Sequence, residues 1–347
     1  MRRGLMGWNP EELPKAALEA RIARLREAMT RDGFDAALLY INLTRPSAVT
    51  WLTGFTPYWS DGLMLVTGQG APVLATALSK RVGNWMCTTD TLSEIVNTPK
   101  PGALVGKRMA DAGCKRAGVL EYDSLPAGLF DEIAGTAPGI ELTDLGAAFA
   151  GIRRAIDDAE RGLIGRADAL ALAALDEIDA AAAKDAGEVA GVVEKKARLG
   201  GAEEAYIAVA PDLDADTRMI RVAGTMPLAG RFAVRASVAY KGSWVRRTRS
   251  FARDDAACRA YADADAWLGR VVSAIAPGKP LDAQITRRLS QLSGASLRDW
   301  MAESCIGSYP LEAVADAPAD WSFLVLTTGL SLGGIPWLGA APAFVGR

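Results

Sequence analysis

A regular alternation of apolar and polar positions lies between residues 231 and 251. Every second side chain from Phe232 to Tyr240 is apolar, which predicts a strand with one apolar face. A Lys241-Gly242 pair separates this segment from Trp244–Phe251, and a two-residue loop of this kind predicts an antiparallel hairpin. The loop length fixes the expected register of the two strands.

In this register Ser237 faces Arg246 and Arg235 faces Thr248, so these four side chains share one face of the hairpin. Two guanidinium groups on one face repel each other unless an anion, a carboxylate or water lies between them. The face is therefore a candidate anion site. The alternative is a pair of solvated arginines, because antiparallel sheets often have one face in water.

The rest of the chain divides into two patterns. Up to about residue 142, helical stretches alternate with short apolar runs, which predicts an α/β layer domain. From residue 157 an alanine-rich helical pattern extends to about residue 184, and a second helix, a strand at 204–210, the hairpin and two more helices follow. We place the boundary near residue 150, with domains 1–150 and 151–347.

Composition restricts the chemistry. The sequence contains no histidine, so it supplies no imidazole base or imidazole metal ligand. The four cysteines are far apart and form no C-x-x-C pair, which favours buried free thiols. A net charge of −2 indicates no general attraction to nucleic acid or membranes. We expect no signal peptide, no membrane span and a cytoplasmic location.

The hairpin resembles the metal-binding hairpin of the creatinase, prolidase and aminopeptidase P superfamily. That motif has a Tyr-x-Gly turn followed by Ser-Asp-x-Thr-Arg-Thr-Phe, and residues of this chain match it at the same spacing: Tyr240, Gly242, Thr248, Arg249 and Phe251. Trp51–Phe55 is similar to the Tyr-Leu-Thr-Gly-Phe turn of the N-terminal domain. The resemblance implies an α/β N-terminal domain and an α+β pita-bread domain, in which a curved antiparallel sheet is flanked by helices.

The resemblance also places ligand positions on unsuitable residues. The two aspartates of the family hairpin fall on Arg235 and Arg246, the ligand histidine falls on Ser304, and a ligand glutamate falls on Thr327. No acidic residue occurs near 337–344, where the last glutamate is expected. A pair of divalent metals needs several carboxylate oxygens, so we expect neither metal nor another cofactor.

The remaining candidate residues follow from the same comparison. Arg249 would join Arg235, Arg246, Ser304 and Thr327 in binding an anion, and loop residues Tyr58 and Trp59 would line a pocket, unless they are ordinary packed aromatics. Any acid, base or nucleophile would come from a small set of side chains: Glu303, Cys305, Tyr240 and Tyr309. None of these has an activating base next to it in the sequence.

Three functional hypotheses follow. The first is a catalytically inactive homologue of Xaa-Pro peptidases that acts as a structural or regulatory subunit, as a homodimer or with an active paralogue. The second is a metal-independent hydrolase whose arginine-lined pocket takes a small anionic substrate. The third is a binding module, to which the basic run 246–249 gives little support, because Arg247 and Arg249 fall on the other face of the hairpin.

Overall fold

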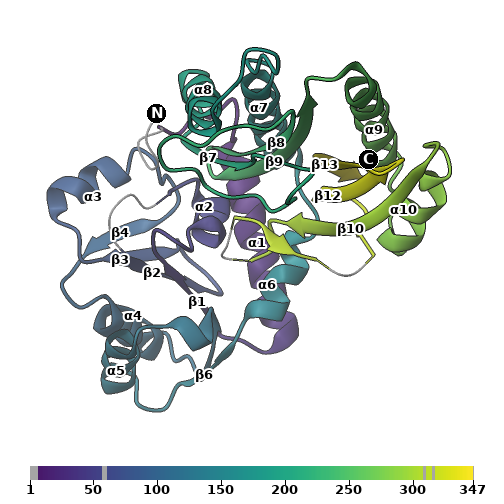
Figure 1. Ribbon diagram of the computed structural model, residues 1–347. Helices are drawn as coiled ribbons and strands as arrows, with labels where there is room; N and C mark the ends of the chain where they lie inside the picture. Colours follow the sequence, from purple (N-terminus) through teal and green to yellow (C-terminus); the bar gives the residue numbers. More distant parts are fainter. Residues whose placement is uncertain (1–6, 57–60, 308–309, 315–316, 347) are drawn as a thin grey trace. The chain divides into compact units, whose positions relative to one another are not determined.

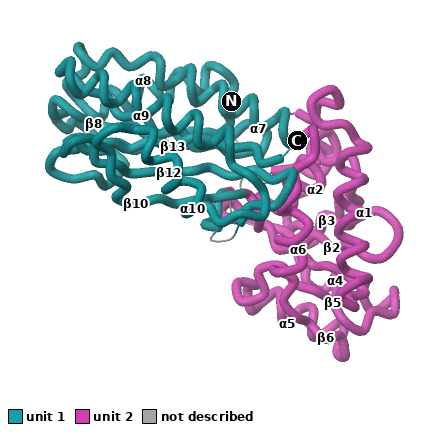
Figure 2. The backbone as a smooth tube through the Cα atoms, turned by 90° about the vertical axis from the view of Figure 1, so that its right-hand side faces the viewer, with its two compact units in different colours: residues 1, 160–304, 311–347 teal, residues 2–159, 305–310 magenta. Residues whose placement is uncertain are grey.

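The computed structural model describes residues 7–56, 61–307, 310–314 and 317–346. The chain forms two compact units (Figure 2). One consists of Arg2–Ala159 with Cys305–Pro310, and the other of Glu160–Ser304 with Leu311–Arg347. Residue 150, where the sequence predicts the domain boundary, lies inside helix α6 (Gly146–Arg153).

The first unit contains a six-stranded sheet with strand order β4-β3-β2-β1-β5-β6 (Figure 1). Its strands are β1 (Ala36–Ile41), β2 (Gly62–Thr67), β3 (Val73–Thr76), β4 (Glu94–Asn97), β5 (Arg116–Leu120) and β6 (Glu141–Asp144). The β1-β2-β3 segment is antiparallel, and the β4-β3, β1-β5 and β5-β6 pairs are parallel. This confirms the predicted α/β layer domain.

Helices cover both faces of this sheet. They are α1 (Lys15–Asp32), α2 (Ser47–Thr53), α3 (Lys80–Met86), α4 (Pro101–Asp111), α5 (Ala127–Thr136) and α6, with the short helix η1 (Tyr122–Ser124). Leu39 of β1 packs in one cluster with residues of α1, α2 and α6, whereas Leu38 packs in another with residues of α4 and α5. Adjacent strand residues point to opposite faces, so a fully buried strand must be apolar at every position, as β1 is.

The second unit contains a seven-stranded antiparallel sheet with strand order β11-β10-β12-β13-β9-β8-β7. Its strands are β7 (Glu204–Ala210), β8 (Arg231–Tyr240), β9 (Ser243–Ala252), β10 (Ala295–Ser304), β11 (Glu312–Ala313), β12 (Ser322–Leu332) and β13 (Ile335–Val345). Its helices are α7 (Asp158–Leu175), α8 (Ala186–Leu199), α9 (Asp255–Ser273) and α10 (Leu281–Leu289). The sheet is curled into the half-barrel of a pita-bread fold, which confirms the predicted fold class (Figure 1).

Two apolar clusters attach helices to one side of this curled sheet. Val234 and Ala236 of β8 pack with residues of α7 and α8. Leu326 of β12 and Ala341 of β13 pack with residues of α9 and α10. We call this side of the sheet the helical face and the opposite side the inner face.

The hairpin forms in the predicted register. Strands β8 and β9 place Arg235 opposite Thr248 and Ser237 opposite Arg246. The two loop residues, Lys241 and Gly242, have φ values of 48° and 78°. Positive φ at both positions is typical of the tight turn that matches the twist of a two-residue hairpin.

The helix predicted from 157 to 184 is too long, because α7 ends at Leu175. Beyond this point the Asp179 carboxylate accepts hydrogen bonds from the backbone N–H groups of Ala181 and Ala182. The Arg253 guanidinium also binds the carbonyl groups of Ala180 and Ala183. These contacts stabilise a turn in a run whose helix propensity alone favours a helix.

No helix in the described part of the chain is long and apolar enough to cross a lipid bilayer.

A buried arginine holds the first unit together. Arg21 of α1 is 2% exposed, and its Nε and Nη2 atoms donate to the Asp157 carboxylate at 2.6 and 2.8 Å. Its Nη1 atom donates to the Trp51 carbonyl oxygen at 2.7 Å. This guanidinium therefore joins α1, α2 and the segment that precedes α7.

We expect Arg21→Met to lower the free energy of unfolding by about 3 kcal/mol, because it removes two hydrogen bonds to the Asp157 carboxylate and one to the Trp51 carbonyl, and leaves Arg24 as the other basic residue at Asp157. Urea unfolding measures this change. The matched control is Lys107→Met, which removes an exposed ion pair with Asp111 and should cost about 0.5 kcal/mol or less. Equal losses in the two variants would contradict the role given to Arg21.

Candidate functional site

A row of residues crosses the inner face from β8 to β12. Arg235 pairs with Thr248, Thr248 with Ala340, and Ala340 with Thr327. Residues directly opposite each other in antiparallel strands point to the same face, so all four side chains lie on the inner face. With strands about 4.8 Å apart, Thr248 and Thr327 are about 10 Å apart, with the small Ala340 side chain between them.

The second arginine of the inner face already has a carboxylate partner. Arg246 donates through Nη1 to Oε2 of Glu303 and through Nε to the Ser237 hydroxyl at 3.2 Å. The exposed fractions of the Arg246 and Glu303 side chains are 17% and 9%. Glu303 lies on β10, with β12 and β13 between it and β9 in the strand order. The curl of the sheet brings these distant strands together.

Arg235 is different, because its Nε atom is buried and has no hydrogen-bond partner among the described residues. Burial lowers the pKa of its guanidinium below the ordinary value, repulsion from Arg246 adds to this effect, and attraction to Glu303 opposes it. The charged form of Arg235 is therefore incompletely compensated by the protein.

Two hydroxyl groups in the row share this property. The Oγ1 atoms of Thr248 and Thr327 are buried, and neither has a partner among the described residues. A buried polar group without a hydrogen bond is costly, and native proteins pair most such groups with protein, water or ligand. Arg235, Thr248 and Thr327 together offer one cationic donor and two hydroxyls to a ligand that would lie over Ala340.

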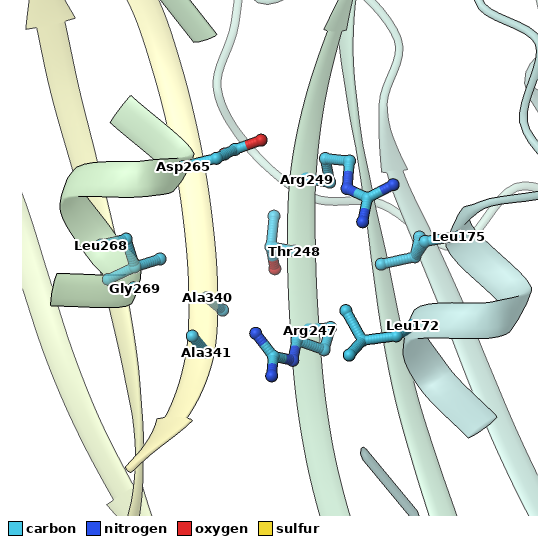
Figure 3. A pocket seen from close by; sticks show the side chains of 10 residues that line it. All are labelled: Leu172, Leu175, Arg247, Thr248, Arg249, Asp265, Leu268, Gly269, Ala340 and Ala341. Carbon is cyan, nitrogen blue, oxygen red and sulfur yellow. The ribbon is translucent and has the colours of Figure 1, made fainter. Parts of the chain in front are cut away.

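Other predicted anion-binding residues lie on the helical face. Arg249 Nη1 donates to the Asp176 carboxylate at 2.7 Å, and Arg247, two residues earlier, donates through two nitrogens to Asp168 of α7. Both arginines line a pocket between α7 and α9 (Figure 3). Ser304 follows Glu303 and points away from the inner face, and its hydroxyl donates to the Phe323 carbonyl oxygen at 2.6 Å.

Of the predicted catalytic candidates, the two described in the second unit, Glu303 and Tyr240, lie on opposite faces of the sheet. Tyr240 is an odd number of residues away from Arg235 and Ser237 on β8, so its side chain points to the helical face. There the Arg166 guanidinium is 5.8 Å from the centroid of its ring. Glu303 is bound to Arg246, and the buried Cys305 thiol donates to the Pro310 carbonyl oxygen at 2.8 Å. Tyr58, Trp59 and Tyr309 lie outside the described residues.

Acidic residues that organise the second unit were not identified from the sequence. Asp168 and Asp176 hold arginines of β9, and Asp265 of α9 lines the pocket in Figure 3. Asp168 interrupts the apolar stripe of a predicted helix, which is a weak signal. Among the described residues, no group of three or more His, Cys, Asp or Glu side chains is arranged to hold a metal ion.

Comparisons with known proteins agree with this architecture. Residues 21–155 match the family model of the Creatinase/Prolidase N-terminal domain. No curated protein matches the chain at a significant level.

Solved structures match along nearly the whole chain. They include an Xaa-Pro dipeptidase from Bacillus anthracis, with 19% identity, a TM-score of 0.71 and coverage of 94% of this chain and 95% of that chain. A prolidase from Pyrococcus horikoshii OT3 has 17% identity, a TM-score of 0.69 and the same coverage. An X-Pro aminopeptidase from Thermotoga maritima MSB8 has 16% identity, a TM-score of 0.71 and coverage of 92% and 95%.

These identities show the fold and not the activity. Together, the family match, the layered first unit and the curled sheet of the second confirm the resemblance seen in the hairpin and in Trp51–Phe55. Residues 21–155 thus match the creatinase/prolidase N-terminal domain, and the chain as a whole has the fold of the solved prolidase and aminopeptidase structures.

Proposed function

We propose that this protein does not act as a metallopeptidase, and that its inner face binds a small anion instead. The observation that carries the proposal is the row formed by Arg235, Thr248 and Thr327, in which three buried polar atoms lack partners among the described residues. A small carboxylate would accept from the guanidinium and from the hydroxyl groups. It would thereby compensate the unbalanced charge of Arg235.

The residues of the inner face do not fit a pair of divalent metals. Hard cations need several carboxylate or carbonyl oxygens, and Glu303 on this face is already bound to Arg246. Arg235 and Arg246, at the positions where the hairpin resembles the metal-binding motif, would repel a cation. We also propose that Ser304 and Thr327 stand at two further metal-ligand positions of the family, where neither provides a carboxylate or an imidazole.

The same arrangement supports catalytic inactivity. Hydrolysis without metal needs a nucleophile next to an activating base, and the described site provides no such pair with a free base. We therefore favour a structural or regulatory subunit, located in the cytoplasm, in a homodimer or with an active paralogue. The alternative is a metal-independent hydrolase that uses the arginines of the inner face to hold an anionic substrate.

We expect the purified chain to give no hydrolysis of Ala-Pro above the uncatalysed rate, with or without added Mn²⁺ or Co²⁺. Reverse-phase chromatography of the products and metal analysis measure this, with a prolidase as positive control. The assay should be repeated after co-expression with an active paralogue, whose activity or stability should then change. Metal-dependent hydrolysis by the chain alone, lost on chelation, would overturn the proposal.

The anion site has a test of its own. We expect acetate to shift the Nε–Hε resonance of Arg235 in nuclear magnetic resonance spectra, with a dissociation constant in the millimolar range or below. Thr248→Val and Thr327→Val should weaken this binding, whereas Arg249→Gln, on the helical face, should leave it unchanged. An Arg235 signal that acetate does not move would contradict the site.

Replacing Arg235 with an uncharged residue should stabilise the protein when no ligand is bound. We expect Arg235→Met to raise the free energy of unfolding by about 1 kcal/mol, or the thermal midpoint by about 2–4 °C, because a poorly compensated charge no longer needs to be desolvated. A functional residue commonly shows this opposition between stability and binding. A clear loss of stability would instead make Arg235 a structural residue.

A further inference from the structure

A pocket on the helical face of the second unit shares Thr248 and Ala340 with the inner-face row, but different charged groups line it. It is a cavity of about 110 Å³. Residues of α7 and α9 form its sides, and residues of β9 and β13 form its floor (Figure 3). The lining consists of Leu172, Leu175, Arg247, Thr248, Arg249, Asp265, Leu268, Gly269, Ala340 and Ala341.

The two arginines of this pocket have more N–H donors than the described protein acceptors use. Arg249 uses Nη1 for Asp176, and its Nε and Nη2 atoms make no hydrogen bond with a described residue. Arg247 uses Nε and Nη2 for Asp168, which leaves Nη1. A guanidinium has five N–H donors in a planar arrangement that matches a carboxylate. The two ion pairs fix the guanidinium groups and leave donors for a ligand.

Asp265 adds a titratable group to the lining. Its Oδ1 atom accepts from the Trp337 indole N–H at 3.1 Å, and Figure 3 shows its carboxyl group directed from α9 towards β9. Burial raises the pKa of Asp265 to about 6, the hydrogen bond from Trp337 opposes this rise, and Arg249 opposes it further. Below this pH the carboxyl group carries a proton that it can donate to a ligand.

Apart from Thr248, the remaining lining is apolar. Leu172, Leu175 and Leu268 provide aliphatic surface beside the charged groups. A liquid water molecule takes about 30 Å³, so the cavity has room for about three or four waters, or for an acid with a chain of two or three carbons. Half-apolar lining with guanidinium donors suits such a molecule better than an inorganic ion.

We propose that this pocket binds a small aliphatic monocarboxylate, with its carboxylate against Arg249 and Asp265 and its alkyl chain against the leucines. The charged groups of this second site differ from Arg235 of the anion site on the inner face. The chemistry requires Asp265 in its protonated form, since two adjacent carboxylates repel each other unless they share a proton. Binding therefore takes up a proton, and the affinity falls as the pH rises through about 6.

The other charged groups around Asp265 do not reverse the direction of this pH dependence. From the α7 side, Asp168 and Asp176 are each neutralised by an arginine of β9. β13 contributes the neutral Trp337 indole and contains no charged residue. Arg249 is the charged group that acts on Asp265 directly, and its attraction lowers the pKa of that carboxyl group.

Propionate is the probe for the test, and the indole N–H resonance of Trp337 is the reporter, because this group is bound to Asp265. We expect propionate to shift this resonance and to bind about eightfold more tightly at about pH 5.5 than at about pH 7.0, from the protonated fraction of a group with a pKa of about 6. Asp265→Asn should remove this pH dependence.

Two variants keep the test independent of folding. A Cβ atom at Gly269 meets no atom within 4 Å, so Gly269→Leu should fold, gain stability as a helix residue and block the pocket. Gly269→Ala is its matched control and should bind propionate. Arg249→Gln should weaken binding at least tenfold, whereas Arg235→Met should not change it.

Three results would overturn the proposal. They are a Trp337 resonance that propionate does not move, a response to inorganic phosphate without one to propionate, and equal propionate affinity in Gly269→Leu and the wild type. Because the Arg235 and Trp337 signals report on different faces of the sheet, the two proposed sites fail or succeed separately.

Discussion

Ion pairs between arginines of one strand and carboxylates of other elements organise the second unit. Strand β9 carries three arginines within four residues, and each has an acid from a different part of the unit: Arg246 with Glu303, Arg247 with Asp168 and Arg249 with Asp176. The first pair connects β9 with β10 across the inner face. The other two attach α7 and the residue after it to the helical face. Ion pairs therefore attach neighbouring elements to β9, as apolar packing does elsewhere in the sheet.

Arg235 stands out because it belongs to the same hairpin and lacks such a partner at Nε. A buried cation that the protein leaves partly uncompensated lowers stability, so its presence suits a site whose ligand completes the set of contacts. The two threonine hydroxyls in the same row strengthen this interpretation, since each could have been an apolar side chain at no cost to packing. The proposed role in anion binding accounts for all three residues at once.

Local patterns predicted much of this fold, and long-range contacts account for most of what they missed. The Lys241-Gly242 loop determined the hairpin register because only one pairing is compatible with a two-residue turn. The end of α7 depends on the local turn made by Asp179 and also on Arg253, which is distant in sequence and binds the carbonyl groups of this turn. Likewise, the partner of Arg246 follows from the curl of the sheet, which no local pattern encodes. Tyr240 belongs to the motif by residue type and spacing, but its side chain lies on the helical face, away from the inner-face arginines.

The alternation of arginines along β9 has a consequence for how the strand finds its place. A shift of β9 by one residue would turn Arg246 towards the helices and Arg247 and Arg249 towards the inner face, away from their acids. A strand tolerates a one-residue shift in register when its two faces are similarly hydrophobic. Here a misaligned strand would lose three ion pairs together, so the charges favour the native register over shifted pairings during folding.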